Sequence, residues 1–345
     1  MPKIWIDISN VPHVLFFKNI IHKLEQKNEV LVTARDYGPV IDLLKQLELP
    51  FIKVGKHGGK ELEGKLIESM KRIIELTEII AKEKPELAVC KSSVELCRVA
   101  FGLSIPIIEI ADNDKSKAVN KLTFPLATRI ITPNAIDKKL LMEDGATFEK
   151  IVQFYGVCEL ANISDFSPNR KVLDDLGINE KKPLIILRFE PVFAAYLKKA
   201  SPLLEVLKLL KEKIENKQFV LFPRTPEQAE IVRKIAKEAI IPERVVDTLS
   251  LLNYATLMVG AGGTMNRESA LLGVPTISCY PGKLLAVDKF LIEKSLMFYL
   301  TNPIEILKFT QKLIQTHEQQ KQFAGKVILS FENPIRIPIK LFLIN

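Results

Sequence analysis

Short, largely apolar segments recur along the whole chain and alternate with stretches of helical spacing. Strands that are apolar along their length and separated by helices are typical of a parallel sheet covered on both faces. The gaps between the apolar segments carry helical patterns, as in Val14–Gln26 and Glu61–Lys82. The apolar segments of the first half are Ile4–Ile8, Val30–Ala34, Phe51–Val54, Leu87–Val89, Pro106–Ile110, Ile130–Thr132 and Val152–Tyr155.

A polar break interrupts this alternation near the middle of the chain. Residues 158–171 are rich in Asn, Ser, Asp and Pro and have little periodicity, which predicts a linker over 158–169. Because the alternation then restarts, the 345 residues favour two α/β domains, 1–157 and 170–345. We expect two Rossmann-like open parallel sheets that face a cleft, with ligands outside the carboxyl ends of the strands. The apolar segments of the second half are Leu184–Phe189, Phe219–Phe222, Val245–Val246, Leu257–Val259, Thr276–Tyr280 and Phe298–Leu300.

The composition is that of a globular protein with a basic excess. Hydrophobic residues make up 47% of the chain and the net charge is +8. No apolar run reaches the roughly 18–20 residues of a membrane span, and the N-terminal sequence lacks the apolar core of a signal peptide, so we expect a cytoplasmic protein. An ordinary Lys/Glu surface explains the charge better than an anionic ligand or a membrane surface. Aromatic residues are not interleaved with basic clusters, so nucleic acid is not an expected partner.

Two patterns invite a metal interpretation, and neither favours it. The scattered cysteines favour buried thiols over a metal or redox site. The Asp-x-Asp spacing of Asp112 and Asp114 could hold Mg²⁺ on a diphosphate, but a polar loop with Asp114 as a helix cap is favoured. We therefore expect no metal site and no bound cofactor. The cysteines are Cys90, Cys97, Cys158 and Cys279.

A glycine loop lies between a strand and a helix late in the second half. Leu257–Val259 precedes Gly260–Thr264, and Met265–Leu272 has helical spacing. Glycines let a backbone approach a phosphate, and a helix N-terminus offers unpaired N–H groups with a partial positive charge. Thr264 could cap the helix or touch the phosphate with its hydroxyl. Glu268 lies about one turn in, where a carboxylate could accept both hydroxyls of a ribose. A tight turn with a solvated acid is the alternative, and the context favours a phosphate site.

The run Gly260–Pro275 resembles the donor-site motif of glycosyltransferase-B enzymes. It is similar to that of the lipid-linked N-acetylglucosaminyltransferase of peptidoglycan synthesis and that of UDP-N-acetylglucosamine 2-epimerase. In those families the glycines and the helix start hold the nucleotide diphosphate, and the helix glutamate binds the ribose. The resemblance implies the glycosyltransferase-B fold and these roles here. The expected site residues of this motif are Gly260, Gly262, Gly263, Thr264, Met265 and Glu268.

Two arginines follow strands of the second half at equivalent positions. Arg188 ends one apolar segment, with Glu190 two residues later, and Arg224 follows the next segment. Arginine forms bidentate hydrogen bonds to phosphate. Two such residues near a glycine loop favour an anion site over ordinary surface arginines.

The start of the chain also carries polar groups at strand ends. His13 follows the first apolar segment, where an imidazole could serve as a base or merely cap the helix, and both interpretations are open. These features resemble an uncharacterised family common in archaea, which has the glycosyltransferase-B fold and begins with an Asp-Ile/Thr-x-x-Pro-His segment. The resemblance implies site roles for Asp7, Pro12, His13 and Arg35.

A further stretch is similar to the 2-epimerase. Pro106–Glu109 resembles a strand that ends in a catalytic-region glutamate, and Ala127–Asn134 follows the same pattern. The chain departs from the epimerase at 91–93, where Lys-Ser-Ser replaces an aspartate, and a second expected glutamate is absent. Because elimination and re-addition of UDP require positioned acids and bases, true 2-epimerase chemistry is disfavoured.

The sequence therefore favours a glycosyltransferase that binds a UDP-linked sugar in the cleft, with an unknown acceptor. Arg188 and Arg224 would neutralise the leaving diphosphate, while His13 or Asp7 would assist the acceptor hydroxyl. One alternative is a nucleotide-sugar epimerase or hydrolase with Glu109 as the acid or base. Another is a non-catalytic nucleotide-sugar-binding protein.

The first helix raises the question of a peripheral contact with the inner face of the membrane. Phe16 and Phe17 are adjacent, so one of them must lie off the centre of a core-facing stripe. An exposed aromatic beside Lys18 and Lys23 could rest on an anionic bilayer. Burial of both rings is favoured, because helices on a parallel sheet need wide apolar faces.

Overall fold

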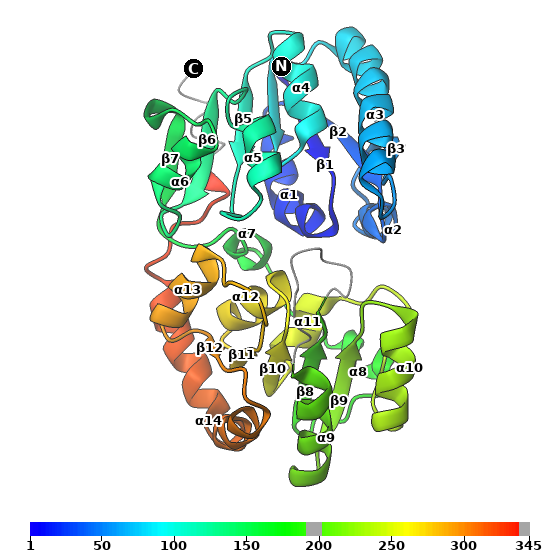
Figure 1. The fold of residues 1–345 in the computed structure, drawn as a ribbon, viewed down its shortest axis with the longest axis vertical. Coiled ribbons are helices and arrows are strands. Elements are labelled where there is room, and N and C mark those ends of the chain that lie inside the picture. The colour runs from blue at the N-terminus through cyan, green and yellow to red at the C-terminus, as the bar shows by residue number, and fades with distance from the viewer. Residues whose placement is uncertain (191–201, 338–345) are drawn as a thin grey trace. The chain divides into compact units, whose positions relative to one another are not determined.

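The chain folds into two compact units, each built on its own open sheet (Figure 1). The computed structural model describes residues 1–190 and 202–337. Unit 1 comprises Met1–Ser164 and Glu332–Asn345, and unit 2 comprises Asp165–Phe331. Strand pairing within both sheets is parallel. The predicted α/β class with two open parallel sheets is confirmed.

Unit 1 contains a seven-stranded sheet in the order β3-β2-β1-β4-β5-β6-β7. Strands β4 and β5 are buried along their whole length, as the apolar segments predicted. The chain order reverses between β1 and β4, and open α/β sheets bind ligands at such a switch point. The strands are β1 (Lys3–Ile8), β2 (Glu29–Asp36), β3 (Ile52–Lys56), β4 (Leu87–Cys90), β5 (Ile107–Ile110), β6 (Arg129–Pro133) and β7 (Ile151–Phe154). The helices are α1 (Val11–Leu24), α2 (Val40–Gln46), α3 (Leu62–Glu83), α4 (Val94–Gly102), α5 (Lys117–Thr123), α6 (Lys138–Glu143), the 3₁₀ turn Phe148–Lys150 and α7 (Leu160–Ile163).

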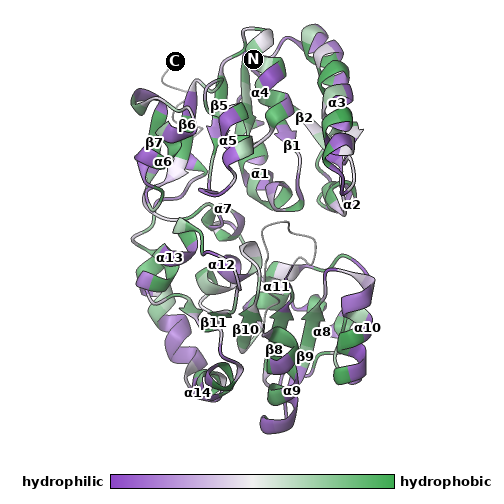
Figure 2. Ribbon diagram, in the orientation of Figure 1, coloured by the Kyte–Doolittle hydropathy of each residue, from purple (hydrophilic) through white to green (hydrophobic). Residues whose placement is uncertain are grey.

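Unit 2 contains a five-stranded sheet in the order β12-β11-β10-β8-β9. Figure 2 shows hydrophobic residues along β8, β9 and β10. The order reverses between β8 and β10, so the carboxyl ends of these two strands flank the switch point of unit 2. The strands are β8 (Leu184–Arg188), β9 (Gln218–Phe222), β10 (Leu257–Gly260), β11 (Thr276–Ser278) and β12 (Phe298–Tyr299). The helices are α8 (Lys171–Leu176), α9 (Leu203–Lys213), α10 (Pro226–Ile235), α11 (Thr248–Asn253), α12 (Thr264–Leu271), α13 (Ala286–Glu293) and α14 (Pro303–Ile328).

One predicted strand of unit 2 is wrong. Val245–Val246 forms no strand, and Val245 is exposed. The two valines are followed by Asp247, whose carboxylate accepts from the Ser250 N–H at 3.0 Å and so caps α11. Val245–Val246 therefore belongs to the segment that leads into α11.

The ends of unit 1 differ from the predicted domain boundaries. Cys158 and Ala161 belong to the apolar core of unit 1, so the first part of the expected linker is packed within that unit. After α14 the chain returns to unit 1, where Ile335 is fully buried in the same core. The Glu332 N–H donates to the Tyr155 carbonyl at 2.7 Å and fixes this return. Pro338 and the residues after it lie outside the described part.

Helix α1 buries both of its adjacent phenylalanines. Phe16 is 1% exposed and Phe17 is fully buried, and their ring centroids lie 5.1 Å apart in an edge-to-face arrangement. The helix therefore presents neither ring to a bilayer. None of the helices within residues 1–190 and 202–337 combines the length and apolar character that crossing a membrane requires.

Candidate functional site

The glycine loop, residues 260–263, joins β10 to α12 and is tied to the strands on both sides. The Gly260 carbonyl accepts from the Asn266 side-chain amide and from the Cys279 N–H, both at 3.0 Å. The N–H of the residue after Gly260 donates to the Arg188 carbonyl at 2.9 Å. A Cβ on Gly260 would lie 2.0 Å from Asn266 Oδ1, so this close approach requires glycine. The loop is thus held in one place at the switch point.

Two arginines converge on the middle of this loop. A Cβ on Gly262 would lie 3.4 Å from Arg224 Nη2 and 3.9 Å from Arg188 Cγ. Arg188 Nη1 donates to the Phe222 carbonyl and Arg224 Nε donates to the Phe189 carbonyl, each at 3.3 Å. These contacts hold both side chains at the carboxyl ends of their strands. The predicted grouping of the two arginines with the glycine loop is present within unit 2.

The electrostatics of this group favour an anion. Burial of the Arg188 guanidinium and the positive charge of Arg224 lower the pKa of Arg188 to about 9. Arg188 Nε is buried and makes no hydrogen bond within the described part of the chain. A negative ligand beside Gly262 would offset the repulsion between the two cations and supply acceptors for their N–H groups.

The start of α12 adds a third arginine. Gly263 is the N-cap, and Thr264 is the first helical residue rather than the predicted cap. A Cβ on Gly263 would lie 2.8 Å from Arg267 Nη1, which donates to an Asp288 carboxylate oxygen at 2.8 Å. Arg267 is buried, and its bond to Asp288 fixes it against the loop. Sequence reasoning passed over Arg267, although it lies within the same motif.

The remaining predicted residues of unit 2 lie around this start. Met265 is half-buried, and the Glu268 side chain lies one turn further, only 2% exposed. Glu190 follows β8, and its carbonyl accepts from Gln228 Nε2 at 3.2 Å. Burial raises the pKa of Cys279, and the charge of Glu190 raises it further, which places that carboxylate near the end of β11.

In unit 1, the Asp7 carboxylate is fully buried and surrounded by donors. It accepts from Arg72 Nη1 at 3.1 Å and Nη2 at 2.6 Å, and from the hydroxyls of Thr33 and Ser93, both at 2.6 Å. Burial alone would raise the pKa of Asp7, but the Arg72 charge and these hydrogen bonds lower it. Asp7 therefore anchors α3 and the start of α4 to β1. Sequence reasoning missed Arg72, which lies in the middle of a helix, where no local pattern marks a buried partner.

His13 lies near the carboxyl end of β1 and is 6% exposed. Its Nδ1 is 3.4 Å from the Ser9 hydroxyl. Burial and the positive charge of Lys91 lower the pKa of His13 to about 3, so the imidazole is neutral at neutral pH. Lys91 forms an ion pair with Asp112 at 2.5 Å, and Arg35 Nη2 donates to the Ser9 carbonyl at 2.9 Å. These residues gather at the switch point of unit 1; Lys91 could have been found as the residue directly after β4.

Glu109 makes its hydrogen bonds on the next strand, β5. It is fully buried on β5, where it accepts from the Cys90 thiol at 2.8 Å and from the Ser92 N–H at 2.7 Å. Burial raises the pKa of Glu109 to about 8. Of the Asp-x-Asp pair, Asp112 contacts Lys91, and Asp114 contacts its neighbour Lys115 at 2.6 Å, so each carboxylate pairs with a lysine.

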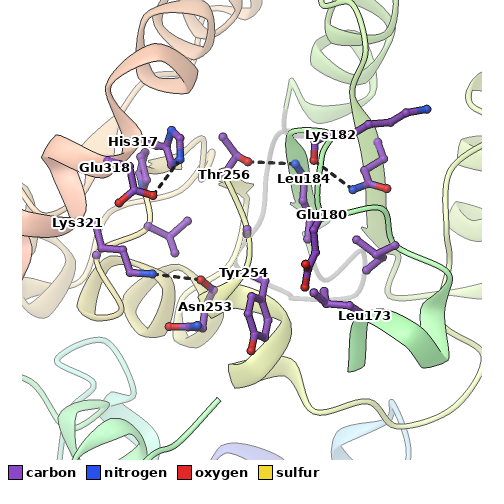
Figure 3. Close-up of a pocket in the computed structure, with 16 residues that line it drawn as sticks. Leu173, Glu180, Lys182, Leu184, Asn253, Tyr254, Thr256, His317, Glu318 and Lys321 are labelled. Carbon is purple, nitrogen blue, oxygen red and sulfur yellow. Dashed lines mark hydrogen bonds and ion pairs between the residues drawn. The ribbon is translucent and has the colours of Figure 1, made fainter. Parts of the chain in front are cut away.

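A cavity of about 370 Å³ lies elsewhere on unit 2 (Figure 3). Its lining includes Leu184, Thr256 and Pro275, which begin or precede β8, β10 and β11. It therefore lies at the amino edge of the sheet, opposite the glycine loop. Polar groups around it contact one another, such as Lys321 Nζ with the Asn253 carbonyl at 3.5 Å. We assign the candidate site to the glycine loop, on which the side chains of Arg188 and Arg224 converge.

Comparison with solved structures identifies the fold. The UDP-GlcNAc 2-epimerase from Neisseria meningitidis, bound to UDP-GlcNAc, matches with a TM-score of 0.74 and 15% identity over 99% of this chain and 100% of that chain. The glycotransferase of kitacinnamycin matches with a TM-score of 0.60 and 11% identity over 95% and 96%. The predicted glycosyltransferase-B type of fold is confirmed.

Sequence comparison identifies the family. The chain is 42% identical over 314 residues to "Uncharacterized protein MJ0665" from Methanocaldococcus jannaschii, covering 89% of this chain and 90% of that protein. Residues 2–341 match the family described as "Protein of unknown function (DUF354)", and the chain belongs to that family.

Proposed function

We propose that this protein binds a UDP-linked sugar through unit 2 and transfers the sugar to an acceptor. The observation that carries the proposal is the convergence of Arg188 and Arg224 on Gly262, directly before the N-terminus of α12. A helix N-terminus and two guanidinium groups are complementary to a diphosphate in charge and in hydrogen bonding. A neutral ligand would leave the repulsion between the arginines in place.

The diphosphate has a defined role in this proposal. Its oxygens accept from the N–H groups at the start of α12, while Arg188 and Arg224 neutralise the charge that builds up as the sugar leaves. Glu268 lies one turn into the helix and binds the ribose hydroxyls. Arg267, held by Asp288 at 2.8 Å, keeps the start of α12 in position.

His13 is the group of unit 1 that would contact an acceptor hydroxyl. With a pKa of about 3 it is a neutral imidazole, and it accepts a hydrogen bond from the hydroxyl rather than storing a proton. Asp7 and Arg35 have positioning roles: Asp7 binds Arg72, and Arg35 holds the Ser9 carbonyl beside His13. Peripheral contact with a membrane is not part of this proposal, and co-sedimentation with anionic liposomes tests it separately.

Epimerisation of the nucleotide sugar is the second candidate. The similarity in fold to a 2-epimerase that was solved with UDP-GlcNAc favours it. The surroundings of Glu109 weigh against it, because the carboxyl is fully buried and already bonded to Cys90 and Ser92. The transferase proposal requires no acid at this position.

A binding and turnover experiment separates these functions. Calorimetry with UDP and UDP-GlcNAc comes first, followed by release of UDP with and without candidate acceptor mixtures. Transfer gives acceptor-dependent UDP release, epimerisation gives the C2 epimer without an acceptor, and hydrolysis gives free sugar. Binding without turnover leaves a nucleotide-sugar sensor. Absence of binding to any nucleotide or nucleotide sugar would refute the proposal as a whole.

A further inference from the structure

Two thiols and a carboxyl group meet inside unit 1. Cys90 is the last residue of β4, Cys97 lies in the first half of α4, and Glu109 lies on β5, where it is the register partner of Cys90. All three side chains are fully buried. Each of the three can offer one metal-ligating atom, and these atoms lie within 4.8 Å of one another.

The three ligand atoms lie close enough together to share one metal ion. Cys90 Sγ lies 3.7 Å from Cys97 Sγ and 2.8 Å from Glu109 Oε2, and Cys97 Sγ lies 3.9 Å from Oε2. These three distances define a triangle whose centre is ~2.1 Å from each of the three ligand atoms. An ion that lies ~0.8 Å above the plane of the triangle would be ~2.2 Å from each ligand atom. Zn²⁺ binds thiolate sulfur at about 2.3 Å and carboxylate oxygen at about 2.0–2.2 Å. We propose that Cys90, Cys97 and Glu109 bind a thiophilic divalent cation of the Zn²⁺ type.

The surroundings of the cluster fix its ligands in place. The Ser92 N–H donates to Glu109 Oε1 at 2.7 Å, which leaves Oε2 turned toward the sulfurs. Ser93 caps α4 by accepting from the Leu96 N–H at 3.3 Å, and this cap sets the first turn that carries Cys97. Groups that orient the ligands in this way are a regular feature of metal sites.

All three ligands bind a metal in their deprotonated forms, so a divalent ion would offset two of their three negative charges. The three protein ligands would leave the fourth tetrahedral position to a water or a small anion. The sequence analysis favoured buried thiols over a metal, because the spacing of Cys90 and Cys97 does not reveal that Glu109 on the next strand faces both.

The proposal does not depend on nucleotide binding, since it shares no residue with the glycine loop. It has a consequence for the second candidate function, because a glutamate bound to a metal is not available as an acid or base for a sugar. A metal here would hold β4, α4 and β5 together, which is a structural role.

The test is metal binding by the purified full chain. The protein is equilibrated with Zn²⁺, desalted and assayed by plasma mass spectrometry, and a second sample is titrated with Co²⁺. We expect close to one zinc per chain, and thiolate-to-cobalt charge-transfer absorption in the near ultraviolet with tetrahedral bands in the visible. The variants Cys90→Ser and Cys97→Ser are expected to lose nine-tenths or more of the zinc and of the cobalt absorption. Cys158→Ser, which replaces a buried cysteine outside the cluster, is expected to keep both.

Two results would overturn the proposal. One is a wild-type chain that holds less than a tenth of a zinc and shows no cobalt bands. The other is a Cys97→Ser variant that retains as much metal as wild type. If the cysteine variants do not fold, the wild type decides the question: a chelator should lower its thermal unfolding temperature, and added Zn²⁺ should restore it. An unfolding temperature that responds to neither would also contradict the site.

Discussion

Replacing Arg224 by glutamine separates an anion site from a chance meeting of two arginines. The substitution keeps a polar side chain but removes the positive charge that faces Gly262. In the wild type this charge lowers the pKa of Arg188. A hydrogen bond to a charged group contributes about 1.5–3 kcal/mol, and 1.4 kcal/mol is a factor of ten in affinity. We therefore expect the Kd for UDP to rise about 10- to 150-fold in Arg224→Gln.

The stability of the ligand-free protein should respond differently. Arg224 donates one long hydrogen bond to the Phe189 carbonyl, at 3.3 Å, and its charge opposes that of Arg188. These terms have opposite signs, so the free energy of unfolding should change by no more than about 1 kcal/mol. A residue kept for folding would show the reverse pattern, with stability lost and binding retained.

The assay is calorimetric titration with UDP, together with urea denaturation of the free protein. Arg233→Gln is the matched control, because Arg233 lies on α10 of the same unit and pairs with Glu243 at 3.7 Å on the surface. It should leave the Kd within about twofold. Equal affinities of wild type and Arg224→Gln for UDP would contradict an anion site at Arg224. An equal loss of affinity in Arg224→Gln and Arg233→Gln would show that the overall charge of the protein, rather than the position of Arg224, determines binding.

Four further outcomes follow from the structure. Asp7→Asn leaves the buried Arg72 guanidinium without its main partner. The free energy of unfolding, measured by urea denaturation, should fall by about 3–5 kcal/mol, and a loss under about 1 kcal/mol would contradict the structural role of Asp7. The folded state lowers the pKa of His13 from 6.5 to about 3, so protonation of His13 favours the unfolded chain. The free energy of unfolding should therefore fall as the pH drops from 6.5 toward 3, and it should fall less in His13→Gln; parallel pH profiles of the two proteins would contradict this. Gly263→Leu should abolish the thermal shift produced by UDP because its side chain meets the held Arg267, whereas Gly325→Leu, in open space on α14, should retain it. Because Phe17 is fully buried, Phe17→Ala should destabilise unit 1 by about 3–5 kcal/mol. For the same reason the wild type should not sediment with anionic liposomes through α1, and sedimentation at low salt that Phe17→Ala removes would contradict the burial of this ring.

The pattern of apolar segments predicted most of the fold because buried parallel strands leave a strong local signal. The strands from Ile4–Ile8 to Thr276–Tyr280 were found this way, whereas Val245–Val246 was not a strand, since two apolar residues cannot be told from a loop by pattern. The return of Ile335 to unit 1 could not be predicted, because it depends on which core has room for it.

The candidate site was predictable where it is local in sequence. The glycine loop and the two strand-end arginines belong to motifs, and topology alone brings them together at the switch point. Buried partners from distant elements escaped prediction: Arg72 reaches Asp7 from α3, and Glu109 meets Cys90 and Cys97 through strand register. These contacts depend on tertiary packing, which residue spacing does not encode.

A crystal structure of the chain with UDP would show directly where the nucleotide binds. We expect the diphosphate to contact the N–H groups at Gly263 and Thr264, Arg188 and Arg224 each to bond to it, and Glu268 to contact the ribose. UDP bound at another place on unit 2, such as the cavity at the amino edge of its sheet, would contradict the proposed function. So would an empty glycine loop at a UDP concentration that saturates binding in solution.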